Sequence, residues 1–182
     1  MPKTTLAGHP LHPQLVVVPA GLLPFSLAMD LMHGKTGNKS YAEAAYYSLV
    51  GGFVGGLAAS AAGAADYFEI PPHGQTKKIA NLHAVLNVGL LGLTGINLLL
   101  RRGKKRRTVG KLPVLLSLIG NVGVLVSSWY GGQMVYEQGL RVKGRSEIAD
   151  APEIKLPGDR SLTAAFERLQ DAAVPSEKVL RR

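Results

Sequence analysis

The sequence predicts an all-α integral membrane protein, a four-helix bundle followed by a mostly irregular C-terminal tail. Two observations lead to this fold class. Four segments, 14–34, 42–65, 84–100 and 112–135, carry almost no charge, although the chain as a whole is 18% charged. Each is also close to the roughly 20 residues that an α-helix needs to cross a hydrocarbon core about 30 Å thick. A soluble all-α bundle is the alternative, but its surface helices would show a regular polar face.

The expected spans are 14–33, 41–66, 79–100 and 112–138, and they make up a transmembrane domain over residues 1–142. The segment "GKTGNKS" predicts the first turn, the pair Pro71 and Pro72 should stop the second helix, and Pro113 suits the first turn of the fourth helix. We expect no internal repeat among the four spans.

Residues 143–182 are expected to form an exposed tail, because they hold many charges and few large apolar groups. Within the tail, "SLTAAFERLQDAA" (161–173) places apolar residues at helical spacing. This pattern predicts a short amphipathic helix that lies on a partner or on the membrane surface.

Basic residues concentrate in the two loops on the side opposite the termini. These loops hold nine lysines and arginines, including Arg101 and Arg102, against six on the terminal side. The positive-inside rule therefore predicts a multi-pass protein of the bacterial inner membrane with both termini on the outer, periplasmic side. Topology and anionic lipids account for the net charge of +9, and no motif for nucleic-acid binding accompanies it.

Polar residues form stripes along the apolar helices. At about 100° per residue, His83, Asn87, Thr94 and Asn97 share one face of the third span, and Ser117, Asn121 and Ser128 share one face of the fourth. Polar groups in a membrane normally face protein or trapped water. We therefore expect an inward polar stripe that contains Asn87, Asn97 and Asn121.

Small residues recur along one side of the second span. Their spacing of three or four positions allows close helix–helix approach, and we expect this face to be a packing interface. The glycines concerned are Gly51, Gly52, Gly55, Gly56 and Gly63.

Four side chains that can bind metals are expected near the outer ends of their helices: His9, His12, Asp66 and His83. Imidazole binds zinc, copper and iron, and two imidazoles can hold a b-type haem between helices, so a divalent metal or haem b is a candidate cofactor. The alternative is that these histidines only cap helices or bridge loops. The chain has no cysteine, which excludes disulfides and cysteine-ligated clusters. Asp30 and His33 fall at the inner end of the first span.

Four motifs, "GHPLHP", "AGAADYFEIP", "NLHAVLN" and "GGQMVYEQGLRV", resemble a bacterial membrane family catalogued as domain of unknown function 2231. The resemblance covers about residues 6–142 and implies a small four-helix membrane protein. Some members are fused to Rieske-type or c-type cytochrome domains, which implies proximity to electron transfer at the outer face. This chain differs from those members because it lacks any cysteine-based cofactor domain. The positions that match the family motifs are Gly8, His9, Pro10, His12, Pro13, Asp66, His83, Gly131, Gly132 and Gly139.

We therefore expect a non-catalytic membrane protein associated with an electron-transfer chain. Its expected partners are the lipid bilayer and other membrane or redox proteins, which it would contact through the tail and the glycine-rich face. A structural or assembly subunit without a cofactor is the alternative. A transporter has little support without an internal repeat, and the chain shows no phosphate loop, serine nucleophile motif or paired carboxylates typical of an enzyme.

Overall fold

The structure is a computed structural model that describes residues 5–6, 9–103, 107–140, 142, 164–165 and 168–169. Over these residues the protein forms a bundle of four long helices. The helices are α1 (Leu11–Thr36), α2 (Lys39–Phe68), α3 (Gln75–Leu100) and α4 (Lys111–Tyr136). All four are long and apolar enough to cross a membrane, which confirms the predicted fold class and a multi-pass membrane protein. Each differs from its expected span at one end or both.

Two features lie outside the four helices. Strands β1 (Thr5–Leu6) and β2 (His9–Pro10) pair in antiparallel register directly before α1, and this two-residue pairing was not expected from the sequence. Within the predicted tail helix, residues 164–165 and 168–169 are helical. The rest of the tail, 143–163, 166–167 and 170–182, lies outside the described residues.

Local sequence explains where the helices begin and end. Gly37 ends α1 with a left-handed backbone (φ 68°), and its N–H donates to the carbonyl of His33. Asn38 then caps α2 by accepting a hydrogen bond from the backbone N–H of Ser40. The second helix ends at Phe68, before the two prolines, and Pro113 lies buried in the first turn of α4.

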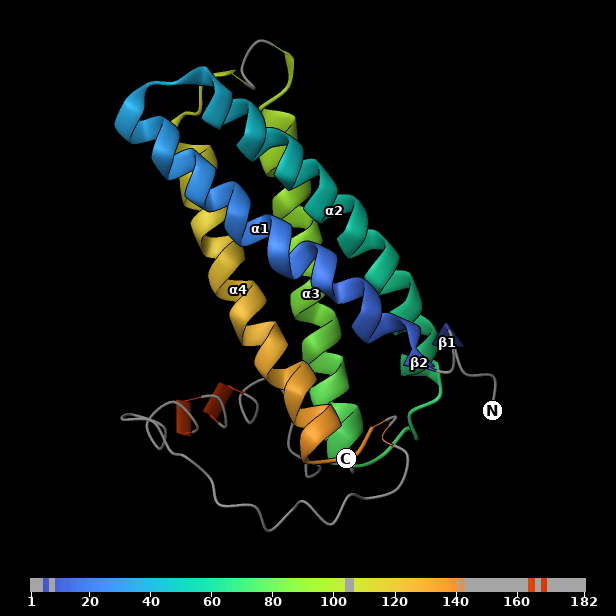
Figure 1. Ribbon diagram of the computed structural model, residues 1–182. Coiled ribbons are helices and arrows are strands. Elements are labelled where there is room, and N and C mark those ends of the chain that lie inside the picture. Colours follow the sequence, from blue (N-terminus) through green and yellow to red (C-terminus); the bar gives the residue numbers. More distant parts are fainter. Residues whose placement is uncertain are drawn as a thin grey trace, which may run out of the picture.

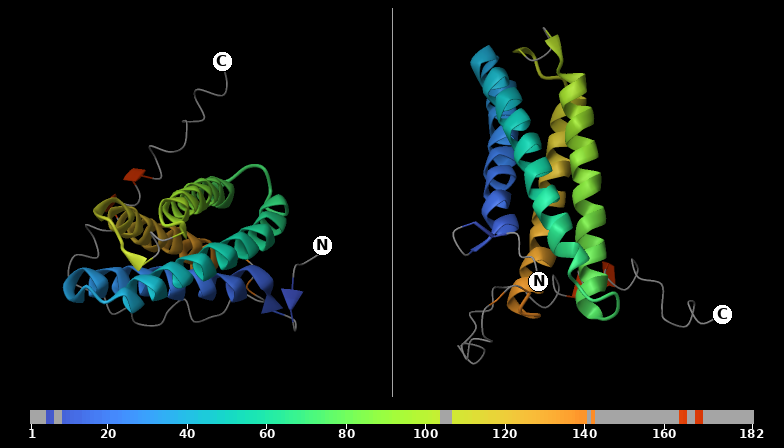
Figure 2. Two further views of the ribbon diagram at one scale, coloured as in Figure 1. Left: turned by 90° about the horizontal axis from the view of Figure 1, so that it is seen from above. Right: turned by 90° about the vertical axis from the view of Figure 1, so that its right-hand side faces the viewer.

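The four helices form two hairpins that lie in two layers. Helices α1 and α2 make one layer and α3 and α4 the other (Figures 1 and 2), with further contacts between α1 and α4 and between α2 and α3. The α1–α2 and α3–α4 connections lie at one end, which we call the loop face. The start of α1, the α2–α3 connection and the end of α4 lie at the other end, which we call the terminal face.

Large apolar side chains cover the outside of the bundle. Val17, Val88 and Leu125 are each more than 60% exposed, at 65%, 71% and 71%. Side chains of this kind on three different helices would be costly in water, so they face the lipid bilayer.

Helix α1 lies against the glycine face of α2. A methyl group added at Gly51 would lie 2.7 Å from Leu22, and one at Gly52 would lie 2.6 Å from Leu23. At Gly55 it would collide with Val18, and at Gly63 it would lie 2.9 Å from the ring of His12. Gly56 instead faces Leu91 of α3, where the added group would lie 3.0 Å away. The bundle's own helices therefore lie against these five glycines.

Two hydrogen bonds of the first hairpin recur at equivalent positions of the second, so the expectation of no internal repeat is wrong. In the first hairpin, His12 and Ser26 of α1 bond the carbonyls of Ala59 and Ala45 of α2. In the second, His83 and Asn97 of α3 bond the carbonyls of Ser127 and Pro113 of α4. Equivalent residues are 71 apart in α1 and α3 (12 to 83, 26 to 97) and 68 apart in α2 and α4 (45 to 113, 59 to 127).

Residue identities follow the same offsets. Between α1 and α3 the identical pairs are Leu11/Leu82, His12/His83, Leu15/Leu86, Val17/Val88, Gly21/Gly92, Leu22/Leu93 and Leu27/Leu98. Between α2 and α4, including the residue that follows each helix, they are Gly52/Gly120, Val54/Val122, Gly55/Gly123, Leu57/Leu125, Ser60/Ser128, Gly63/Gly131 and Glu69/Glu137. Many of these are leucine, valine or glycine, which apolar helices share by composition alone, and the offset changes by three residues within the repeat. The repeated hydrogen bonds are therefore what reveals it.

The close approach of α1 and α2 predicts that Gly55→Ala lowers stability. The new methyl group would collide with Cβ and Cγ1 of Val18, which lie close to the backbone of α1 and cannot easily move away. The free energy of unfolding should therefore fall by about 1–3 kcal/mol. Gly21→Ala is the matched control, because nothing lies within 4 Å of that position. Thermal unfolding of both variants in mild detergent measures the difference, and equal melting temperatures would contradict this packing.

Candidate functional site

Two histidines from different hairpins meet near the terminal face of the bundle. The ring centroids of His12 (α1) and His83 (α3) lie 6.2 Å apart with their planes at 88°. The two residues occupy equivalent positions in the repeat. One imidazole from each hairpin therefore contributes to a single pair.

Backbone carbonyls fix the orientation of both rings. The Nδ1–H of His12 donates to the carbonyl of Ala59 at 2.8 Å, and the Nδ1–H of His83 donates to the carbonyl of Ser127 at 2.9 Å. A carbonyl can only accept, so the proton of each neutral ring is on Nδ1. The Nε2 atom of each ring then keeps its lone pair.

A glycine makes room for each ring. In an α-helix the residue four positions after a carbonyl donates to it, and these residues are Gly63 after Ala59 and Gly131 after Ser127. A methyl group on Gly63 would lie 2.9 Å from His12 Nδ1, and one on Gly131 would lie 3.3 Å from His83 Cε1. Each imidazole thus fits where a side chain is missing, in the same way in both hairpins.

The predicted polar stripe supports the second ring. Asn87 donates from Nδ2 to the carbonyl of His83 and to the hydroxyl of Ser127, both at 2.8 Å. The same hydroxyl lies 3.1 Å from His83 Nδ1. Ser127 is buried, whereas Ser128, which the angular count placed inward, is exposed.

The other two predicted ligands are placed differently. His9 lies in β2, and its side chain is outside the described part of the chain. Asp66 is buried in the last turn of α2. Within the described residues, no group of three or more His, Asp, Glu or Cys side chains could hold a metal ion, so Asp66 does not join His12 and His83 in such a group.

A second polar site, near the loop face, was not anticipated from the sequence. Arg101, at the C-terminal end of α3, forms a two-pronged ion pair with Asp30 of α1: Nη1 donates to Oδ1 and Nη2 to Oδ2, both at 2.7 Å. Both residues are almost completely buried, at 1% exposure each. Arg101, counted among the loop cations in the sequence, is therefore an interior residue.

Two further residues complete this ion-pair network. Asn97 accepts from Arg101 Nε at 2.8 Å, and its Nδ2 donates to the hydroxyl of Ser117 at 2.9 Å and to the Pro113 carbonyl at 3.0 Å. Ser117 also accepts from Arg101 Nη2 at 3.1 Å. The third predicted stripe residue, Asn121, donates to the carbonyls of Leu23 and Ser117.

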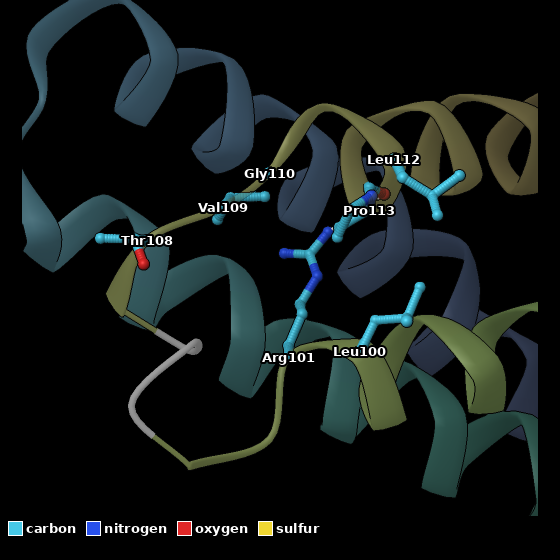
Figure 3. Close-up of a pocket in the computed structure, with 7 residues that line it drawn as sticks. All are labelled: Leu100, Arg101, Thr108, Val109, Gly110, Leu112 and Pro113. Atoms are coloured by element: carbon cyan, nitrogen blue, oxygen red, sulfur yellow. Dashed lines mark hydrogen bonds between the residues drawn. The ribbon is translucent and has the colours of Figure 1, made fainter.

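A cavity of about 390 Å³ lies beside this network, between the ends of α3 and α4. The side chain of Arg101 extends from the end of α3 toward Pro113 (Figure 3), and the cavity is otherwise lined mainly by apolar groups of Leu100, Val109 and Leu112. It borders neither His12 nor His83. The ion pair and the histidine pair are therefore separate sites at opposite ends of the bundle.

The sequence carried a signal for the ion pair, but the grouping of Arg101 with the loop cations hid it. Asp30 is an acidic residue inside an apolar span, and a charge there normally has a partner. Arg101 directly follows "NLLL" and was grouped with the loop cations, because its run of basic residues continues through Arg102 and beyond. The equivalent positions of the two residues, 71 apart, would have paired them.

Comparison with known proteins gives one match. The family model described as "Predicted membrane protein (DUF2231)" matches residues 8–144. No curated protein and no solved structure matches the chain. The matched region covers the four helices, both polar sites and most of the chain, and the protein belongs to this family of predicted membrane proteins.

Proposed function

We propose that this membrane protein binds a transition-metal centre, either a metal ion or a haem iron, between His12 and His83. The centre would serve electron transfer at the outer membrane face. The observation that carries the proposal is the shared state of the two imidazoles: both are anchored through Nδ1–H, and both keep an Nε2 lone pair.

The anchoring is of the kind that metal ligands require. A histidine that binds a metal through one nitrogen commonly donates its other ring N–H to a carbonyl or carboxylate, which fixes the tautomer and raises the basicity of the ligand. Two imidazoles that share one ion at about 2.0–2.1 Å per bond have centroids on the order of 5–6 Å apart. The separation of 6.2 Å between His12 and His83 is close to this range.

The protein would contribute to such a centre by holding the two imidazole ligands in place. The two carbonyls orient the rings, and the two glycines let the rings lie against neighbouring helices. The metal or haem would supply the redox chemistry. Its remaining ligands could be water or porphyrin nitrogens, because the described His, Cys, Asp and Glu side chains offer no third ligand.

This proposal predicts a bound centre in the full-length protein purified in mild detergent. Visible absorption between about 350 and 600 nm would reveal haem as a Soret band, and metal analysis would reveal a bare ion. His12→Ala and His83→Ala should each lower metal or haem content or affinity at least about 10-fold, because each removes one of two ligands.

Two other histidines are the matched controls. His73 is exposed in the α2–α3 connection, and His33 bonds the Asn38 carbonyl at the loop face, so replacing either with alanine should leave the bound centre unchanged. A wild-type protein with neither a Soret band nor stoichiometric metal would contradict the proposal. The histidines would then be packing elements of a structural subunit.

We also propose that the protein lies in the bacterial inner membrane with its loop face in the cytoplasm. Exposed cations of the described loop face are Lys35, Lys39, Arg102, Arg107 and Lys111. At the start of α3, on the terminal face, Lys77 and Lys78 are both half-buried, and the ammonium of Lys77 lies 3.4 Å from the centroid of the Tyr67 ring. The loop face therefore has more cations than the terminal face even without Arg101. This excess favours the orientation with the loop face in the cytoplasm.

The chain's lack of cysteine makes this orientation directly measurable. His73→Cys at the terminal face should react with a membrane-impermeant maleimide in intact cells, or in spheroplasts where an outer membrane blocks access. Thr108→Cys, exposed at the loop face, should react only after the membrane is permeabilised. The reverse labelling pattern would contradict the proposed orientation.

A further inference from the structure

The ion pair joins two residues that occupy the same position in the two hairpins. Asp30 and Arg101 are 71 residues apart, the offset that also relates His12 to His83 and Ser26 to Asn97. Two pairs of equivalent residues are thus in direct contact with each other, His12 with His83 and Asp30 with Arg101. Residues that contact their own equivalents lie on a twofold axis, so an approximate twofold axis relates the two hairpins.

The contacts between the two hairpins agree with this symmetry, although α1 and α2 pack together more extensively than α3 and α4 do. A twofold axis that exchanges α1 with α3 and α2 with α4 turns an α1–α4 contact into an α3–α2 contact. Both contacts are present in the bundle. Glycines also repeat across it, because Gly55 faces Val18 and Pro19 in the first hairpin, and Gly123 faces Leu90, the equivalent of Pro19, in the second.

The two residue pairs on the axis differ in which combinations of hairpins they allow to associate. Histidine faces histidine at the terminal face, so pairing of two identical hairpins would leave that contact unchanged. At the loop face, two first hairpins would place Asp30 against Asp30, and two second hairpins would place Arg101 against Arg101. Like charges in a buried, apolar setting repel strongly, whereas the unlike pair is satisfied.

We infer that the Asp30–Arg101 pair determines which hairpins associate. It makes the interface of a first hairpin (α1–α2) complementary to that of a second hairpin (α3–α4) and not to that of another first hairpin. The two hairpins behave as a fused pair of related units, of which each carries one of the two charges. A second copy of the chain can therefore supply a complementary hairpin when the charges within one chain no longer match.

Charge reversal in the full-length chain tests this inference. Asp30→Arg alone places two arginines at the axis, and Arg101→Asp alone places two aspartates there. Each should reduce the yield of monodisperse protein in mild detergent on the order of 10-fold, because each leaves buried charges unpaired. The double variant Asp30→Arg/Arg101→Asp restores unlike charges and should recover most of that yield.

Co-expression separates recognition from simple stabilisation. When the Asp30→Arg and Arg101→Asp chains carry different tags, exchange of hairpins between them pairs the introduced arginine with the introduced aspartate, and the native Asp30 with the native Arg101. The two chains should then co-purify as a folded dimer, at least about 10-fold more than two differently tagged copies of either variant do. Reversal of the more exposed pair Glu43 and Arg107, in which Glu43 is half-buried, is the control and should change neither yield nor pairing.

Two results would overturn the inference. One is a double charge reversal that yields no more folded protein than the single variants. The other is co-purification of the two single variants at the level seen for two copies of the same variant. The test does not depend on a bound metal, because its readouts are yield and chain pairing.

Discussion

The rest of the bundle depends on one interaction, the buried ion pair between Asp30 of α1 and Arg101 at the end of α3. Two charges inside an apolar bundle are costly unless they are paired and fully hydrogen-bonded, and here both carboxylate oxygens accept from the guanidinium. Asn97 and Ser117 extend the bonding to α4. The pair therefore joins three helices, and removing either partner would leave a charge that no other described side chain neutralises.

The repeat gives this ion pair and the distant histidines a common explanation. Each hairpin brings one histidine, held by a carbonyl and a glycine of its second helix, and each brings one member of the ion pair. Identical residues meet at the terminal face and unlike residues at the loop face. One end of the axis suits a ligand shared equally by both hairpins, and the other end specifies which hairpins pair. Parallel repeats also occur in transporters, so the argument against that class from a missing repeat no longer holds.

The sequence predicted the architecture because membrane helices report themselves through length and the absence of charge. The apolar composition of these helices also made the internal repeat and the buried polar sites hard to recognise in the sequence. Glycine, leucine and valine dominate apolar spans, so repeat identities such as Gly63/Gly131 carried little contrast. Asn97 and Asn121, which the angular count places inward, donate hydrogen bonds to Ser117 and to the Leu23 carbonyl, and the buried serine of α4 is Ser127, next to the expected Ser128. Arg101 was misplaced because it opens a run of basic residues and was counted with them, although the end of α3 at Leu100 was located correctly, and its burial depends on the distant Asp30.

A double-mutant cycle on Asp30 and Arg101 tests the central claim most directly. The free energy of unfolding in mild detergent would be measured for the wild type, Asp30→Asn, Arg101→Gln and the double variant. If the ion pair organises the bundle, the two substitutions are coupled by about 2–3 kcal/mol, because either one alone already removes the interaction. Effects that add within about 0.5 kcal/mol would show that the two residues act independently and would contradict the account.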